Sequence, residues 1–151
     1  MESVNTACKL FEEGRNCSQS LLCSFSPDFG LDAETALKVS RAFGGGMGHM
    51  GETCGALTGA FMVLSLQYDI ADVQARDRLY AQVRDLANQF KALHGSILCR
   101  DLIDCDLSTT EGEIAFKEKN LRKSHCPAFV RDAAQITRQI LDQSTSKLND
   151  R

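Results

Sequence analysis

Four cysteines stand where a predicted helix begins, and these are the side chains in this sequence best suited to redox or metal chemistry. Cys17 follows Asn16, a good N-cap residue, and the others are Cys54, Cys99 and Cys126. Free N–H groups and the macrodipole at a helix start favour a thiolate. The dipole contributes only about 0.3–1 kcal/mol, whereas one pKa unit corresponds to about 1.36 kcal/mol. If the four thiolates converge they repel one another, so we expect a metal, a cluster or disulfides between the sulfurs.

The spacing of these four cysteines does not choose between dithiol and metal chemistry. Long stretches of chain separate them, and no CxxC pair occurs. Zinc ribbons and ferredoxin-type clusters use close cysteine pairs, so any site must be built from separate helices. All four are therefore candidate catalytic thiols, or candidate ligands of zinc or an iron–sulfur cluster, and a site without any cofactor is equally compatible. Cys54 is the first candidate nucleophile, because a helix start and accessible glycines surround it.

The other cysteines and two histidines have less defined interpretations. The chain has seven cysteines, so at least one cannot pair within the molecule. Cys8 and Cys23 fall inside predicted helices and are interpreted as small core residues, whereas Cys105 lies in a predicted loop. His49 and His125 each lie near one of the four helix-start cysteines. Either could be a base, a cation that lowers a thiol pKa, or a ligand, although a structural role is the simpler interpretation.

A glycine-rich loop raises a second possibility, because Gly46, Gly48 and Gly51 form the pattern GxGxxG. A dinucleotide fingerprint needs a strand before the glycines and a helix after them. Here the preceding segment, 31–43, is helical by its cap and its periodicity, so a nucleotide or phosphate site is disfavoured. We instead expect these glycines, with Gly55, to shape a loop beside the thiols.

The segments that position these residues show helical periodicity, and none shows a sustained strand pattern. The sequence predicts an all-α fold, a compact single-domain bundle of about six to eight helices over 1–143, followed by a frayed polar tail at 144–151. Caps, glycines and apolar stripes place helices at about 5–13, 17–25, 33–43, 53–68, 71–94, 97–103 and 127–143. A further helix is expected to begin where Thr109 or Thr110 caps it.

For three of these helices the sequence predicts which residues are buried. The segment 53–68 is apolar nearly all round, which is typical of a helix at the centre of a core. The stripe expected to be buried in 71–94 is Val73, Leu79, Tyr80, Val83, Leu86, Phe90 and Leu93. In the last helix it is Phe129, Val130, Ala133, Ile136, Ile140 and Leu141.

Composition limits the classes of function. The chain has 151 residues, a formal net charge of −3 and a pI near 5.6, without a dominant basic patch, which argues against a nucleic-acid partner. No secretory signal and no apolar run of bilayer length is visible, so we predict a cytoplasmic protein without a membrane span. In a reducing cytosol, seven purely structural cysteines are less expected than a redox or metal role for some of them.

The cysteine contexts together resemble the redox-active C_GCAxxG_C_C family, over about 7–141. The matching stretches are NCSQ, FGGGMG, GETCGALTGA, GSILCRDLI and HCPAFVRDA. The family's hallmark is four cysteines, one of them in Cys-Gly-Ala-x-x-Gly; residues 54–59 match this motif, and Cys17, Cys99 and Cys126 match the others. The resemblance implies a small helical bacterial or archaeal protein with redox activity or a metal centre, often associated with transporter or oxidoreductase genes.

We therefore predict a redox-active protein that uses the four helix-start cysteines, by thiol–disulfide exchange or by holding a metal. Its expected partner is a redox protein or a component of an oxidoreductase or transporter. The alternative is a non-catalytic helical accessory or binding module with structural cysteines. A homodimer is compatible with either hypothesis.

Overall fold

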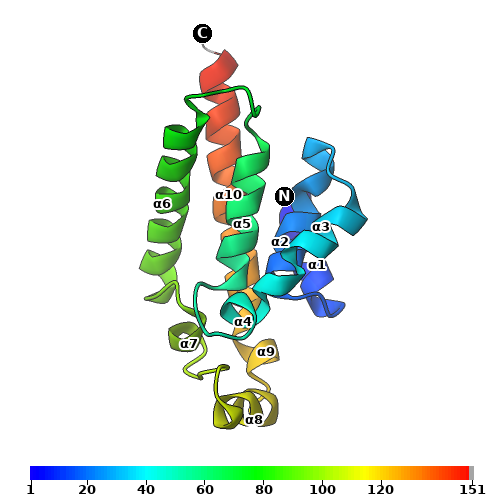
Figure 1. Cartoon of the computed structure of the whole chain (residues 1–151), viewed down its shortest axis with the longest axis vertical. Coiled ribbons are helices and arrows are strands. Elements are labelled where there is room, and N and C mark those ends of the chain that lie inside the picture. Colours follow the sequence, from blue (N-terminus) through cyan, green and yellow to red (C-terminus); the bar gives the residue numbers. More distant parts are fainter. Residues whose placement is uncertain (150–151) are drawn as a thin grey trace.

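The computed structural model describes residues 1–149, and within this range the fold is all-α without strands, as predicted (Figure 1). Helices of eight residues or more are α1 (Glu2–Glu12), α2 (Cys17–Phe25), α3 (Ala33–Ser40), α5 (Gly55–Leu66), α6 (Ala75–His94), α8 (Thr110–Glu118) and α10 (Cys126–Asn149). Short segments are α4 (Gly44–Met47), α7 (Cys99–Leu102) and α9 (Leu121–Ser124), with 3₁₀ turns η1 (Ser26–Phe29) and η2 (Arg41–Phe43).

Helix α5 is the centre of the bundle, as its apolar composition predicts. Figure 1 shows α5 running alongside α10, with α6 on one side and α1 to α3 on the other. Leu57, Ala60, Val63 and Leu64 of α5 are fully buried. Their neighbours in one continuous apolar core come from α2, α6 and α10, so most of the surface of α5 is covered.

The predicted buried stripe is confirmed for α10 and only partly for α6. Every residue of the α10 stripe is buried. In α6, Leu86 and Phe90 are buried, but the prediction was wrong for Val73, Tyr80 and Leu93, which are 92%, 53% and 63% exposed. Val73 precedes the helix, which starts at Ala75, and α6 lies at the edge of the bundle, so it buries only a narrow face against α5 and α10.

The last helix continues through a segment that the sequence predicts as a frayed tail. Helix α10 extends to Asn149. The hydroxyl of Ser144 donates to the carbonyl of Ile140 at 2.9 Å and accepts from Gln82 Nε2 of α6 at 2.8 Å, which ties this part of α10 to its neighbour. Residues 150–151 of the predicted tail lie outside the described residues.

Helices α2 and α5 pack with their backbones nearly in contact. A Cβ placed on Gly59 would lie 2.7 Å from both Leu21 Cβ and the Ser18 carbonyl oxygen. A Cβ on Gly55 would lie 3.0 Å from the Phe43 carbonyl oxygen and 3.2 Å from Cys17 Cβ. The small residues of the Cys-Gly-Ala-x-x-Gly segment therefore let the start of α5 approach the start of α2.

Several helix starts meet at one end of the molecule. In Figure 1, α2, α5 and α10 all begin toward the lower end, where α4, α7, α8 and α9 also lie. No helix in the described range is long and apolar enough to span a membrane.

Gly59→Ala tests the close contact between α2 and α5. Alanine favours a helix by up to about 1 kcal/mol over glycine, but overpacking a tight core costs about 1–3 kcal/mol. Because the new Cβ meets backbone as well as side chain, we expect a net loss of about 1–2 kcal/mol in the free energy of unfolding, measured by chemical denaturation. The exposed Ser65→Ala change on the same helix should stay within about 0.5 kcal/mol of wild type. Equal stability of wild type and Gly59→Ala would contradict the contact.

Candidate functional site

All four helix-start cysteines line one cavity of about 300 Å³. Cys17, Cys99 and Cys126 are the first residues of α2, α7 and α10, and Cys54 immediately precedes α5. Their predicted positions at helix starts are therefore confirmed, although α7 begins at Cys99 itself and not at 97 as predicted. Residues distant in sequence are brought together at the end of the bundle where these helices begin.

The start of α2 is fixed by a capping box. The Gln19 N–H donates to Asn16 Oδ1 at 2.9 Å, and the Asn16 N–H donates to Gln19 Oε1 at 3.2 Å. The Asn16 amide also donates to the carbonyl of Arg41 at 3.0 Å, which ties this helix start to the chain before the glycine loop. Such caps stabilise a helix by about 1 kcal/mol, and here the cap sets the position of Cys17.

Cys54 and Cys99 are held by a short antiparallel pairing of backbone. Thr53 and Leu98 form an isolated bridge. The N–H of Cys54 donates to the Ile97 carbonyl at 2.8 Å, and the N–H of Cys99 donates to the Glu52 carbonyl at 2.7 Å. Outside the bridge, Arg100 and Glu52 form an ion pair at 3.1 Å. These bonds place the two cysteines on adjacent segments.

The glycine loop forms a left-handed turn between η2 and the bridge. Five consecutive residues, 45–49, have φ between 62° and 69°, so the segment labelled α4 is not a right-handed helix over its length. A Cβ on Gly46 would lie 2.7 Å from Cys99 Cβ and from the Glu52 N atom. Glycine is thus required at this position both by its backbone conformation and by the space beside the thiol.

The predicted site glycines do not all reach the cavity. Gly46, Gly48 and Gly55 line it. Gly51 lies outside the lining, where a Cβ would meet Arg100 and Asp106 at 3.3 and 3.4 Å.

Burial keeps two of the four thiols protonated. It raises the pKa of Cys54 to about 12, even though the N–H groups of Ala56 and Leu57 near the sulfur act in the opposite direction. Burial also raises the pKa of Cys99 to about 12, and the neighbouring Cys126 and Cys105 sulfurs add to this shift. At neutral pH both are thiols, because desolvation outweighs the helix-start effect.

The other two thiols, Cys17 and Cys126, have pKa values that are shifted in opposite directions. The Cys17 and Cys126 thiols interact with each other, and this interaction raises the pKa of Cys17 and lowers the pKa of Cys126. The guanidinium of Arg122 also lowers the pKa of Cys126, against the effect of burial. A position at the start of the long helix α10 acts in the same direction. Cys126 is therefore the thiol whose surroundings favour the thiolate.

Arg122, which lowers the pKa of Cys126, is itself held in place by several contacts. Its Nη2 donates to the carbonyls of Phe11 and Arg15 at 2.7 and 2.9 Å. The guanidinium carbon lies 4.0 Å from the centroid of the Phe11 ring, within the range of a cation–π contact. Arg122 lines the cavity together with Cys126.

A comparison with known families matches residues 15–140 to the family described as "Putative redox-active protein (C_GCAxxG_C_C)". The chain belongs to this family. No curated protein and no solved structure matches the chain. The C_GCAxxG_C_C match supports the resemblance drawn from the cysteine contexts, and the cysteines that carried it are those lining the cavity.

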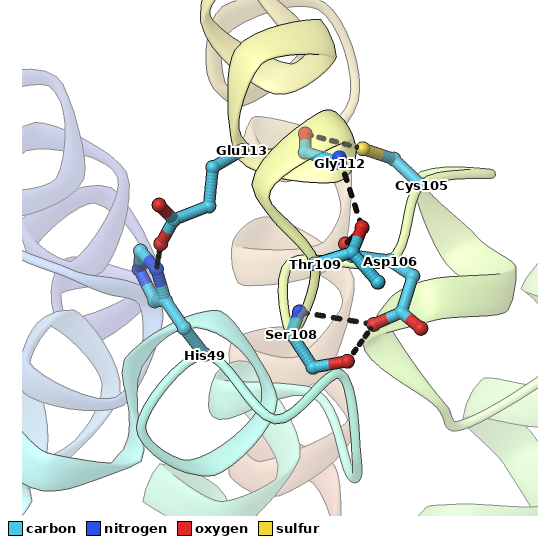
Figure 2. Close-up of polar contacts among 7 residues, drawn as sticks. All are labelled: His49, Cys105, Asp106, Ser108, Thr109, Gly112 and Glu113. Carbon is cyan, nitrogen blue, oxygen red and sulfur yellow. Dashed lines mark hydrogen bonds and ion pairs between the residues drawn. The ribbon is translucent and has the colours of Figure 1, made fainter.

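The remaining cysteines of this C_GCAxxG_C_C protein lie outside the cavity lining. Cys8 and Cys23 are partly buried, and desolvation raises the pKa of both thiols. Cys105 lies close enough to Cys99 that a charge on the Cys105 sulfur raises the pKa of the Cys99 thiol. Its S–H donates to the Gly112 carbonyl at 2.9 Å (Figure 2).

The two histidines near the hallmark cysteines in sequence do not contact a thiol in the structure. Figure 2 shows His49 of the glycine loop directed toward Glu113 of α8, with His49 Nδ1 3.1 Å from Glu113 Oε1. His49 nevertheless lines part of the cavity. His125 is exposed and contacts the hydroxyl of Ser124 at 2.7 Å. Neither histidine is placed as the base of a thiol.

Sequence reasoning missed two parts of the site. Arg122 is one of several basic residues between 117 and 123 in which no sequence pattern indicates a site, and only the fold shows that it lines the cavity. The Thr53–Leu98 bridge joins two segments without strand periodicity, so no sequence pattern could indicate it. The one sequence feature that could have pointed to Arg122 is its position, four residues before the start of α10.

The thiol environments predict a specific order of alkylation. We expect iodoacetamide near pH 7.5 to modify Cys126 before Cys54 or Cys99, because only the thiolate reacts and both latter thiols keep their protons until the pH approaches about 12. The rate at Cys126 should fall as the pH drops through its lowered pKa. Peptide mapping by mass spectrometry provides the measurement.

Two variants separate the causes of this reactivity. Cys17→Ala removes the neighbouring thiol and should move the pH profile of Cys126 to higher pH, whereas Cys17→Ser keeps an O–H group and should move it less. Arg122→Gln should also move it to higher pH. Identical profiles in all four proteins would contradict the assignment of the thiolate to Cys126.

Proposed function

We propose that this protein is a thiol–disulfide redox protein whose reactive pair is Cys126 and Cys17. The observation that supports this most strongly is that both thiols line one cavity, where their interaction raises the pKa of Cys17 and lowers the pKa of Cys126. The family description as redox-active is consistent with this chemistry.

We propose Cys126, and not the sequence-based candidate Cys54, as the nucleophile. Cys54 begins a helix beside glycines, as expected, but burial raises its pKa to about 12. The interaction with Cys17 and the guanidinium of Arg122 both lower the pKa of Cys126. A thiol with a pKa near the ambient pH attacks a disulfide most efficiently.

The reaction requires two exchange steps. The Cys126 thiolate attacks one sulfur of a substrate disulfide, forms a mixed disulfide, and releases the other half as a thiolate. That thiolate takes the proton of Cys17. The Cys17 thiolate then attacks the Cys126 sulfur and expels the second half of the substrate. The substrate gains two electrons, and the protein pair becomes a disulfide.

A redox partner protein is proposed to reduce this disulfide again. Such a partner, or a component of an oxidoreductase, would return two electrons to the pair and restore the two thiols. Cys54 and Cys99 remain protonated during the first two steps, and we assign them the role of a second, less reactive pair beside the first.

Trapping the mixed disulfide tests the order of events. In Cys17→Ala, no resolving thiol remains next to Cys126, so a small aromatic disulfide should leave one adduct on Cys126 that persists in the intact mass. In wild type the adduct should be transient, and a Cys17–Cys126 disulfide should replace it. Cys23→Ser, which changes a partly buried cysteine outside the cavity, should behave like wild type.

An adduct that persists equally in wild type and Cys17→Ala would contradict the resolving role of Cys17. Unaltered reactivity in Cys126→Ser would contradict the nucleophile. If Cys126→Ser and Cys17→Ala lose folding stability and no thiol in folded wild type reacts, the non-catalytic module with structural cysteines becomes the better account.

A metal or an iron–sulfur cluster held by Cys17, Cys54, Cys99 and Cys126 is the second candidate. The convergence of four thiols on one cavity favours it, and thiolates are the ligands that zinc and such clusters take. In the described part of the chain, however, no three His, Cys, Asp or Glu side chains stand in a geometry that could hold an ion. The donor types fit and their present positions do not, so binding would require the sulfurs to move. Stoichiometric zinc or iron that is lost in Cys54→Ser would support this candidate.

A further inference from the structure

The charge of the cavity wall is opposite to that of the whole chain. The protein carries 20 acidic against 17 lysine and arginine residues. The residues that line the thiol cavity include Arg41 and Arg122, and none of them is aspartate or glutamate. A cavity with cationic and apolar lining and without carboxylates favours an anionic occupant.

Arg122 has unused capacity to bind such an anion. In the described residues its guanidinium has no carboxylate within ion-pair distance, and only Nη2 makes hydrogen bonds, both to backbone carbonyls. The donors on Nε and Nη1 are therefore available. Contact with the Phe11 ring holds the guanidinium plane in place, which reduces the entropy lost when a carboxylate binds.

The other residues that line the cavity limit the size and the polarity of the ligand. Leu102, Ile103, Leu107 and Phe116 supply apolar walls, and the glycine loop contributes bare backbone. A volume of about 300 Å³ is at the lower end of the range for small-molecule sites, which is roughly 300–1,000 Å³. A short carbon chain with one charged end fits these walls.

We propose that the substrate is a small disulfide that carries a carboxylate. Arg122 binds this carboxylate while Cys126 attacks the disulfide. This proposal rests on the thiol–disulfide function proposed above. The carboxylate takes no part in the covalent steps. The bond that forms joins Cys126 to one substrate sulfur, the bond that breaks is the substrate S–S bond, and the released thiolate takes the Cys17 proton. Arg122 is then a specificity-determining residue in addition to its effect on the thiolate.

The test compares three aliphatic disulfides that differ mainly in charge: 3,3′-dithiodipropionate (anionic), 2,2′-dithiodiethanol (neutral) and cystamine (cationic). The rate of loss of the Cys126 thiol is measured for each with the full chain. Wild type should react fastest with the anionic and slowest with the cationic compound. In Arg122→Gln, the ratio of the anionic to the neutral rate should fall about fivefold to tenfold. Because any change in the reactivity of the thiolate affects both rates, it cancels in this ratio.

Two further variants complete the design. Arg84→Gln removes the same charge from an exposed position of α6 outside the cavity and should leave the ratio at the wild-type value. Arg122→Lys keeps the charge without the planar fork and should give an intermediate ratio. If Arg122→Gln does not fold, the order of the three rates in wild type and the ratio in Arg122→Lys still decide the question.

The outcomes distinguish failure of this inference from failure of the proposed function. Equal ratios in wild type, Arg122→Gln and Arg84→Gln, with fast reaction of the neutral disulfide at Cys126, would overturn the carboxylate site alone. If the ratio of the anionic to the neutral rate fell equally in Arg122→Gln and Arg84→Gln, the net charge of the protein would explain the preference. This result would also overturn the carboxylate site. Reaction that does not involve Cys126, with any of the three compounds, would overturn the proposed function.

Discussion

Repulsion between sulfur charges is the constraint on which this site depends. Four cysteines at helix starts each gain something from ionising, yet thiolates that line one small cavity oppose one another. The structure meets this constraint by leaving one thiolate favoured. Burial raises the pKa values of Cys54 and Cys99, and the interaction with Cys126 raises the pKa of Cys17. The pKa of Cys126 is lowered by this interaction and by Arg122. Desolvation outweighs the helix dipole at two positions, as the small magnitude of the dipole effect suggests.

The scaffold around the sulfurs explains why so much of this end of the molecule is glycine or small residue. Gly59 lets α5 approach α2, and Gly46 lets the left-handed loop approach Cys99. Neither position has space for a Cβ. The same close approaches that bring the helix starts together exclude water from the sulfurs, so packing and electrostatics at this site have one common cause.

The sequence was sufficient for most of the helices and for the position of the four cysteines at helix starts, because caps and periodicity are local. Asn16 caps α2 as expected, Asp32 caps α3, and Gly95 ends α6. It was insufficient for the roles of the cysteines, because burial depends on which segments meet. Cys54 is a candidate nucleophile when judged by its neighbours in sequence, whereas its burial, which raises the pKa of its thiol, is the reason that we propose Cys126 instead. The same limit applies to Arg122, and to Val73, Tyr80 and Leu93, whose exposure follows from the position of α6 at the edge of the bundle.

The most direct test is a count of metal and of free thiols per chain after strictly anaerobic purification, before and after oxidation with one equivalent of a disulfide. The account predicts a chain without stoichiometric metal, in which the seven thiols decrease by the two at Cys17 and Cys126 and return on reduction. Stoichiometric zinc or iron that protects all four cavity cysteines from oxidation would contradict it. Such a result would make this cavity a metal centre.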